Sequence, residues 1–158
     1  MKHRAVLCAL VFCVALPGQQ KYTGPKPPKQ DVPYLVHASN LVETESEMAQ
    51  QQDVKNLTTY VINGEGSSAK TPLASPVLVI DVSKLSPEHL QLFRLEQKNG
   101  HREISFPKKG KGGPQPLQLS VSHEEGDLYR IEAVDSLPNG EYSLTPEGSN
   151  QVFCFAIY

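Results

Sequence analysis

The dipeptide Asn99-Gly100, which lies between two runs of alternating apolar residues, constrains the fold of this chain more than any other feature. Asn and Gly accept the positive φ angles of a two-residue hairpin turn at low cost. Counting outward from the turn sets Lys98 opposite His101, Leu95 opposite Ile104, and Phe93 opposite Phe106. Because the apolar partners share one face, the sequence predicts a β-hairpin in this register.

A second hairpin is predicted around Gly126. A three-residue loop, Glu124-Glu125-Gly126, with Gly in the left-handed position, pairs Val121 with Tyr129, Leu119 with Ile131, and Leu117 with Ala133. These pairs again place apolar residues on one face, so both hairpins favour the same architecture. Between the hairpins, residues 107–116 are rich in Gly, Pro and Lys and are predicted to form a solvated loop. An anion site is the minor alternative there, because the spacing of a phosphate-binding loop is missing.

We interpret residues 72–158 as one all-β unit. Seven short strand-like runs are separated by turn signals, near 77–82, 90–97, 102–107, 117–123, 128–134, 141–145 and 151–158. Without a long amphipathic helix, this pattern predicts an antiparallel immunoglobulin-like β-sandwich, with a small barrel as the alternative. Tyr142, which follows a turn, resembles the tyrosine corner of such sandwiches. The last run is apolar on both faces, which predicts an interior strand that buries Cys154.

Residues 1–20 have the layout of a secretory signal peptide, with a basic head, an apolar run over residues 5–16, and then Pro17-Gly18. The run is shorter than the about 20 apolar residues that span a bilayer, so we expect it to be removed on export. A lipoprotein signal that modifies Cys13 is the minor alternative, because bulky Phe12 stands where a small residue is favoured. The expected location is therefore periplasmic or extracellular.

Two further ranges, 21–33 and 34–71, precede the predicted sandwich. The first contains four prolines, which favour an extended linker over a packed element, with a Pro-rich recognition ligand as the alternative. In the second range, strands are predicted at 34–37 and 57–62. The polar stretch 43–56 between them has no apolar stripe, so it is predicted to be an exposed helix or a mobile excursion.

Charge and cysteine content narrow the function classes. The chain has 15 basic and 17 acidic side chains, and loss of Lys2 and Arg4 with the signal leaves 13 against 17, a net charge of −4. This balance argues against a nucleic-acid binder, which needs a clustered basic surplus. No apolar segment after the signal is long enough to span a membrane. Because Cys8 and Cys13 lie in the signal, the exported chain keeps Cys154 alone and is expected to have no internal disulfide.

Several short motifs mark the C-terminal half of the chain. They are Pro76 before Val-Leu-Val-Ile-Asp-Val, Leu92-x-x-Leu95 leading to Arg102-Glu103-Ile104, Leu137-x-x-Gly140-Glu141-Tyr142, and Phe153-x-Phe155. In these motifs the chain resembles a domain of uncharacterised exported bacterial proteins, although Ala156 stands where such proteins often have Gly. The resemblance implies an envelope location and a sandwich fold, and it implies no activity that transfers residue by residue.

We find no catalytic, cofactor-binding or metal-binding candidate in the sequence. The histidines that remain after export lack metal-ligand spacing and are expected on the surface; they are His37, His89, His101 and His123. Ser122 and His123 adjoin on a predicted strand, so they point to opposite faces and do not form a nucleophile with its base. Cys154 is expected to be an inert thiol with a raised pKa. Without Trp and with six Tyr, the chain is poorly supplied with rings for stacking sugars.

These observations favour a non-catalytic, exported interaction or structural module of the cell envelope, with a protein partner and without a cofactor. A small periplasmic hydrolase or an enzyme inhibitor with an unrecognised site is the alternative. It stays open because the separation of two carboxylates in space, on which such a site depends, is not encoded in their sequence positions.

Overall fold

The computed structural model describes residues 21–110 and 112–158, which form thirteen β-strands and one short 3-10 turn, η1 (Pro87–His89). The strands are β1 (Tyr34–His37), β2 (Asn40–Glu43), β3 (Glu45–Met48), β4 (Gln50–Val54), β5 (Leu57–Ile62), β6 (Lys70–Thr71), β7 (Val77–Asp81), β8 (Leu90–Lys98), β9 (His101–Pro107), β10 (Leu119–Glu125), β11 (Leu128–Ala133), β12 (Gly140–Pro146) and β13 (Gln151–Ile157). The predicted signal peptide, with Cys8 and Cys13, lies outside the described residues. In the part of the chain that is described, no helix has the length and apolar character needed to cross a membrane.

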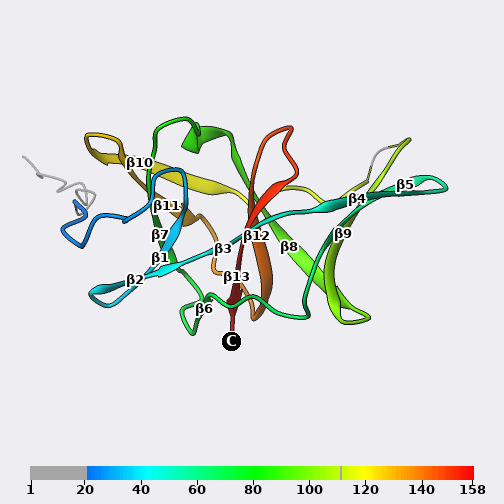
Figure 1. Ribbon diagram of the computed structural model, residues 1–158, viewed down its shortest axis with the longest axis horizontal. Helices are drawn as coiled ribbons and strands as arrows, with labels where there is room; N and C mark the ends of the chain where they lie inside the picture. The colour runs from blue at the N-terminus through cyan, green and yellow to red at the C-terminus, as the bar shows by residue number, and fades with distance from the viewer. Residues whose placement is uncertain (1–20, 111) are drawn as a thin grey trace, which may run out of the picture.

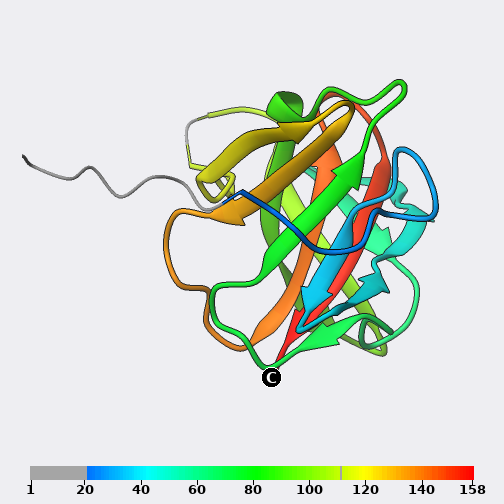
Figure 2. The same cartoon turned by 90° about the vertical axis from the view of Figure 1, so that its left-hand side faces the viewer.

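The strands form two sheets that pack as a sandwich, which confirms the predicted all-β fold (Figure 1; Figure 2). One sheet has five strands in the order β10-β11-β7-β1-β2. The larger sheet has eight, in the order β3-β13-β12-β8-β9-β5-β4, with β6 beside β13. Neighbouring strands are antiparallel except β6 and β13, which are parallel. The seven strands predicted beyond residue 72 correspond to β7–β13.

Residues 34–71 and 72–158 are interleaved in both sheets. β1 lies beside β7 in the smaller sheet. In the larger sheet, β3 lies beside β13 and β5 lies beside β9. The strands before residue 72 are therefore integral parts of the sandwich, and its sheets do not begin at that residue.

The core between the two sheets is built from one face of each. Its residues include Leu35, Leu78, Ile80 and Ile131 from the smaller sheet, and Leu92, Tyr142, Leu144, Phe153 and Phe155 from the larger one. Tyr142 is fully buried, and its hydroxyl donates a hydrogen bond to the Pro138 carbonyl at 2.6 Å. This bond confirms the predicted tyrosine corner, because it ties the strand entry to the preceding turn.

The larger sheet is strongly curled, because the strands at its two ends, β3 and β4, directly follow one another in the chain. β3 pairs with β13 and β4 pairs with β5, while a single residue, Ala49, separates β3 from β4. In Figure 1 the two strands follow one another from the sandwich toward the far tip of the molecule. The sheet therefore has an outer face, which packs in part on the smaller sheet, and an inner face that it encloses. This closure gives the larger sheet the character of the small barrel that was the alternative fold.

The turn at Asn99-Gly100 joins β8 to β9 as predicted. Lys98 lies opposite His101. The φ angles of Asn99 and Gly100 are 52° and 80°, the positive values that this turn requires. The local turn chemistry thus sets the start of the ladder between the two strands.

The ladder between β8 and β9 is short. Its last pair is Glu96 and Glu103. Farther from the turn, β8 pairs with β12 and β9 pairs with β5 instead of with each other, so the two strands of the hairpin separate. The predicted opposition of Phe93 and Phe106 is consequently a ring contact between separating strands, with 5.6 Å between the ring centroids. The separation leaves part of the inner face open.

The register predicted for the second hairpin is wrong by two residues. Val121 lies opposite Ile131, because a bulge interrupts the ladder between His123 and Glu125 and the turn is tighter than a three-residue loop. Gly126 has a φ angle of 60°, so its predicted left-handed conformation is confirmed. A shift of two residues keeps every side chain on its predicted face.

The prediction of an exposed helix or a mobile excursion at 43–56 is wrong. This stretch contains β3, which pairs with β13, and β4, which pairs with β5. All five residues of β4 are exposed. A strand at the end of a sheet is held by its backbone hydrogen bonds on one side, so it forms without the apolar stripe that a docked helix needs.

The segment 21–33 is docked on the sandwich, which corrects its interpretation as a free spacer. It contains no regular strand, as its prolines predict. The Asp31 N–H donates to the Asp81 carbonyl at 2.8 Å. The Asp31 carboxylate accepts hydrogen bonds from the backbone N–H groups of Ser83, Lys84 and Leu85. Burial raises the pKa of Asp31, but these bonds outweigh it and hold the pKa below its usual value.

Candidate functional site

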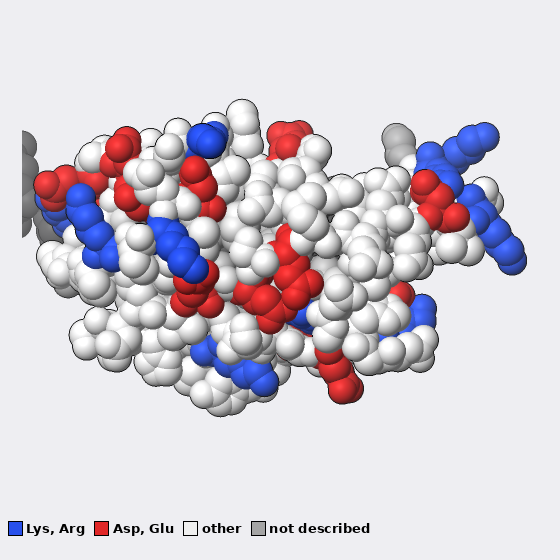
Figure 3. All heavy atoms as spheres, in the orientation of Figure 1, with Lys and Arg blue, Asp and Glu red and all other residues white. Residues whose placement is uncertain are grey.

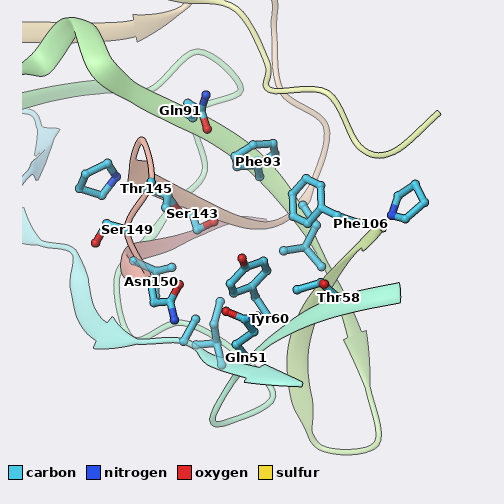
Figure 4. A pocket seen from close by; sticks show the side chains of 17 residues that line it. Gln51, Thr58, Tyr60, Gln91, Phe93, Phe106, Ser143, Thr145, Ser149 and Asn150 are labelled. Atoms are coloured by element: carbon cyan, nitrogen blue, oxygen red, sulfur yellow. The ribbon is translucent and has the colours of Figure 1, made fainter. Parts of the chain in front are cut away.

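A pocket opens on the inner face of the larger sheet, at the end where β8 and β9 have separated (Figure 4). Its volume is about 550 Å³. Small-molecule sites typically measure about 300–1,000 Å³ and are common in the mouths of barrels. The lining residues are Ala49, Gln51, Thr58, Tyr60, Ile62, Gln91, Phe93, Ile104, Phe106, Pro107, Ser143, Thr145, Pro146, Gly148, Ser149, Asn150 and Val152.

The period of two along each strand decides which side chains reach the pocket. In β12, Ser143 and Thr145 line it, whereas Tyr142 and Leu144 belong to the core between the sheets. The same alternation operates in β5, β8 and β9. In each of these strands, the side chains on one face line the pocket, and those on the other face pack in the sandwich core or lie on the outer surface.

Three aromatic rings from three different strands form one side of the pocket. They belong to Tyr60 of β5, Phe93 of β8 and Phe106 of β9. The Phe106 ring lies edge-to-face with both others, at 6.0 Å and 77° from Tyr60 and at 5.6 Å and 87° from Phe93. Such pairs contribute about 0.5–1.5 kcal/mol each beyond their buried area. The fold thus gathers rings that are far apart in the sequence into one cluster.

Several polar side chains line the pocket away from the aromatic cluster, and some of them have no hydrogen-bond partner in the described part of the chain. Among the described residues, no hydrogen bond is made by the side chains of Gln91, Ser143, Thr145 or Asn150. In Figure 4 they lie around the pocket from Gln91 to Asn150, facing the aromatic cluster. Thr58 differs, because its hydroxyl donates to the Asp53 carboxylate at 2.7 Å. The unpartnered amides and hydroxyls are the groups with which the pocket can bind a ligand.

The pocket is neutral although the surface around it carries charges of both signs. Every lining residue is uncharged at pH 7. Basic and acidic side chains are interspersed over the face shown in Figure 3. Near the rim formed by Thr58 and Pro107, Lys108 and Asp53 form an ion pair of 3.1 Å. A ligand inside the pocket therefore meets amides, hydroxyls and rings rather than formal charges.

The other end of the inner face is closed by the segment between β5 and β6, residues 63–69. Arg102 of β9 is fully buried beneath this segment. Its guanidinium donates to the carbonyls of Asn63 at 2.5 Å and Gly64 at 3.1 Å. These bonds hold the segment across the inner face, so the pocket is open at one end and closed at the other.

Four side chains, which we call the Arg102 network, complete this closed end: Arg102, Glu45, Ser67 and Glu141. Arg102 donates to the Glu45 carboxylate at 2.5 Å and to the Ser67 hydroxyl at 2.8 Å. The Ser67 hydroxyl donates to the Glu141 carboxylate at 2.5 Å. Burial raises the pKa of Glu45, but hydrogen bonds from Arg102 and the Ser68 N–H outweigh it and leave the pKa below its usual value.

The histidines singled out in the sequence lie outside the pocket. His101 Nε2 is 2.7 Å from the Glu103 carboxylate, and His123 Nε2 is 2.7 Å from a backbone carbonyl of its own hairpin. His37 and His89 are exposed. Over the described ranges, no group of three His, Cys, Asp or Glu side chains is placed to hold a metal ion.

Cys154 and Ser122 also lie away from the pocket opening. Cys154 is fully buried in β13, and burial raises the pKa of its thiol to about 12, as the sequence predicts. Ser122 and His123 are consecutive in β10, so their side chains leave opposite faces of that strand.

Sequence reasoning missed the pocket residues, which extend from Ala49 to Val152. The available signal was the alternation in 58–62 and 104–106, where the apolar and aromatic side chains share one face in each strand. That pattern identifies a face but not what the face encloses. Comparisons with known protein families, with curated proteins and with solved structures found no match for the chain.

Proposed function

We propose that the protein is an exported, non-catalytic interaction module of the cell envelope, and that the pocket of the larger sheet is its binding site. The observation that carries this proposal is the set of unpartnered polar side chains beside an aromatic cluster. Their polar atoms are open to solvent in the pocket. A ligand that displaces this water must supply hydrogen bonds in its place, because covering a polar group without a partner costs about 1–3 kcal/mol.

The chemistry of the lining supports binding over catalysis. Amides and aliphatic hydroxyls such as those of Gln91 and Thr145 donate and accept hydrogen bonds, but they do not exchange protons near pH 7. General acid–base catalysis uses groups whose pKa lies near the working pH. The pocket therefore has the means to hold and orient a ligand.

Export and family membership stay predictions from the sequence. The basic and apolar residues of 1–20 support export to the periplasm or the medium. The Tyr142 bond to Pro138 supports an immunoglobulin-like arrangement. A protein partner also stays a prediction.

Fragment screening by NMR on the full-length, isotope-labelled chain tests the binding site. We expect polar fragments to shift the backbone amide signals of residues 147–150 and of residues 141–145 in β12. Ser143→Leu, which fills the pocket from its floor, should abolish these shifts. Ser46→Leu, on the exposed side of β3, should keep them. Fragments that bind elsewhere, or shifts that survive Ser143→Leu in a folded variant, contradict the proposal.

Fractionation of expressing cells tests the location. Recovery of a shortened chain from the periplasm or the medium supports export, and retention of the full chain in the cytoplasm contradicts it. Hydrolysis of reporter substrates by the purified protein, lost in Ser143→Leu, would replace the binding role by the enzymatic alternative.

A further inference from the structure

We infer that the ligand of this pocket is an uncharged, hydroxyl-rich saccharide. This inference rests on the proposed function and narrows it to one class of ligand. It follows from three properties of the lining: its neutrality, its unpartnered amides and hydroxyls, and its cluster of aromatic rings.

Neutrality of the lining disfavours a charged ligand. Moving an ion out of water costs several kcal/mol unless an opposite charge or several strong hydrogen bonds compensate it. The charged pair nearest to Thr58, Lys108 with Asp53, is already joined at 3.1 Å. A neutral ligand enters without this cost.

Unpartnered polar atoms disfavour a purely apolar ligand. An acyl chain or hydrocarbon ring in the pocket would cover the side chains of Gln91, Ser143, Thr145 and Asn150 without supplying hydrogen bonds. Each group left in that state costs about 1–3 kcal/mol. A saccharide hydroxyl both donates and accepts, so it can pair with an amide, which presents both functions, or with a serine or threonine hydroxyl.

The aromatic cluster provides the complementary contact. The sequence predicts few rings for stacking sugars, but the fold gathers three of the rings it has into this one pocket. The C–H groups of a sugar ring form an apolar surface between its hydroxyls, and such a surface packs on aromatic side chains through dispersion. Tyr60, Phe93 and Phe106 line one side of the pocket, whereas Gln91, Thr145 and Asn150 lie toward the other. A saccharide presents both kinds of surface in one molecule.

Calorimetric titration of the full-length chain tests the inference. The neutral probes are cellobiose, maltose and diacetylchitobiose, and the acidic probe is digalacturonate. At least one neutral disaccharide should bind, and digalacturonate should bind at least about tenfold more weakly. Gln91→Ala and Asn150→Ala should each weaken the neutral probe about 3- to 10-fold, which corresponds to one lost hydrogen bond.

Gln52→Ala is the matched control, because Gln52 follows the pocket residue Gln51 in β4 and points to the other face. It should bind the neutral probe as tightly as the unaltered chain. If fragments occupy the pocket but every neutral saccharide fails to bind, the ligand class is wrong while the binding site stands. Tighter binding of a peptide or a fatty acid at the pocket overturns the inference in the same way. If no fragment occupies the pocket either, the proposed function fails with it.

Discussion

The two ends of the inner face use polar side chains in opposite ways. At the closed end, the Arg102 network pairs its members with one another and with the backbone of the segment 63–69. At the open end, Gln91, Ser143, Thr145 and Asn150 make no such bonds within the described part of the chain. One curled sheet therefore has an end where polar side chains stabilise the fold and an end where, among the described residues, polar side chains have no partner within the protein. The contrast predicts where substitutions change stability and where they change binding.

Substitution of the central cation gives the largest effect. Arg102→Met keeps much of the side-chain volume but leaves Glu45 and Glu141 without their positive partner. Breaking one side of a buried ion pair costs about 3–5 kcal/mol, so the free energy of unfolding in urea should fall by about that amount. Arg94→Met, at an exposed arginine of β8, is the control and should change it by less than about 1 kcal/mol. Equal effects of the two variants would contradict the structural role of the network.

A matched pair of serines compares the two ends directly. Ser67→Ala removes a hydroxyl that bonds both Arg102 and Glu141, and it should lower the free energy of unfolding by about 1–3 kcal/mol. Ser143→Ala removes a hydroxyl that faces the pocket and has no hydrogen-bond partner among the described residues, so it should change the free energy by less than about 0.5 kcal/mol. Urea titration of both variants measures the difference. A larger loss in Ser143→Ala than in Ser67→Ala would invert the comparison.

Acid should weaken the closed end before it affects the open end. The pKa of Glu45 is lower in the folded protein than its usual value of 4.5, so the unfolded chain binds protons more readily. The stabilising contribution is present above pH 4.5 and is lost as the pH falls through the lowered folded value. Urea midpoints measured from pH 6 downward should show this loss, and Glu45→Gln should show less of it. Asp31 and Glu103 also have lowered pKa values, so a residual slope is expected in that variant.

The smallest effect is expected from thiol reagents. Cys154 lies on the inner face between the two ends, fully buried, and its pKa is about 12. At pH 8 iodoacetamide should leave the folded protein unmodified and modify it only in urea, as followed by mass spectrometry. Arg102→Met should speed the reaction in the absence of urea, because it loosens the closed end. Rapid labelling of the unaltered protein would show that the inner face is open along its whole length.

Local chemistry was the part of the fold that sequence reasoning predicted well. The turn at Asn99-Gly100 and the tyrosine corner at Tyr142 both depend on residues close together in the chain. The register of the second hairpin was missed because a bulge near Glu124 has no distinctive residue pattern. The strands in 43–56 were missed because an edge strand needs backbone partners, and its polar sequence does not reveal them.

The pocket could not be predicted because it depends on how far two strands separate. Phe93 and Phe106 were paired correctly as neighbours on one face. Beyond the pair Glu96 and Glu103, β8 pairs with β12 and β9 pairs with β5 instead of with each other, and this separation creates the space beside the two rings. No local residue pattern in the sequence predicts it. That divergence is a property of all the ladders in the sheet together.

The two end strands of the curled sheet, β3 and β4, are joined by the peptide chain through Ala49. We call this junction the seam of the sheet, and it is covalent. A barrel closed by hydrogen bonds between its end strands can widen by fraying, whereas this seam has a fixed length of chain. The number of residues at the seam therefore limits how wide the mouth of the pocket can become. Lengthening this connection by two residues beside Ala49 would preserve the facing of β4, and we expect it to widen the mouth of the pocket while the side chains of the other lining strands stay unchanged.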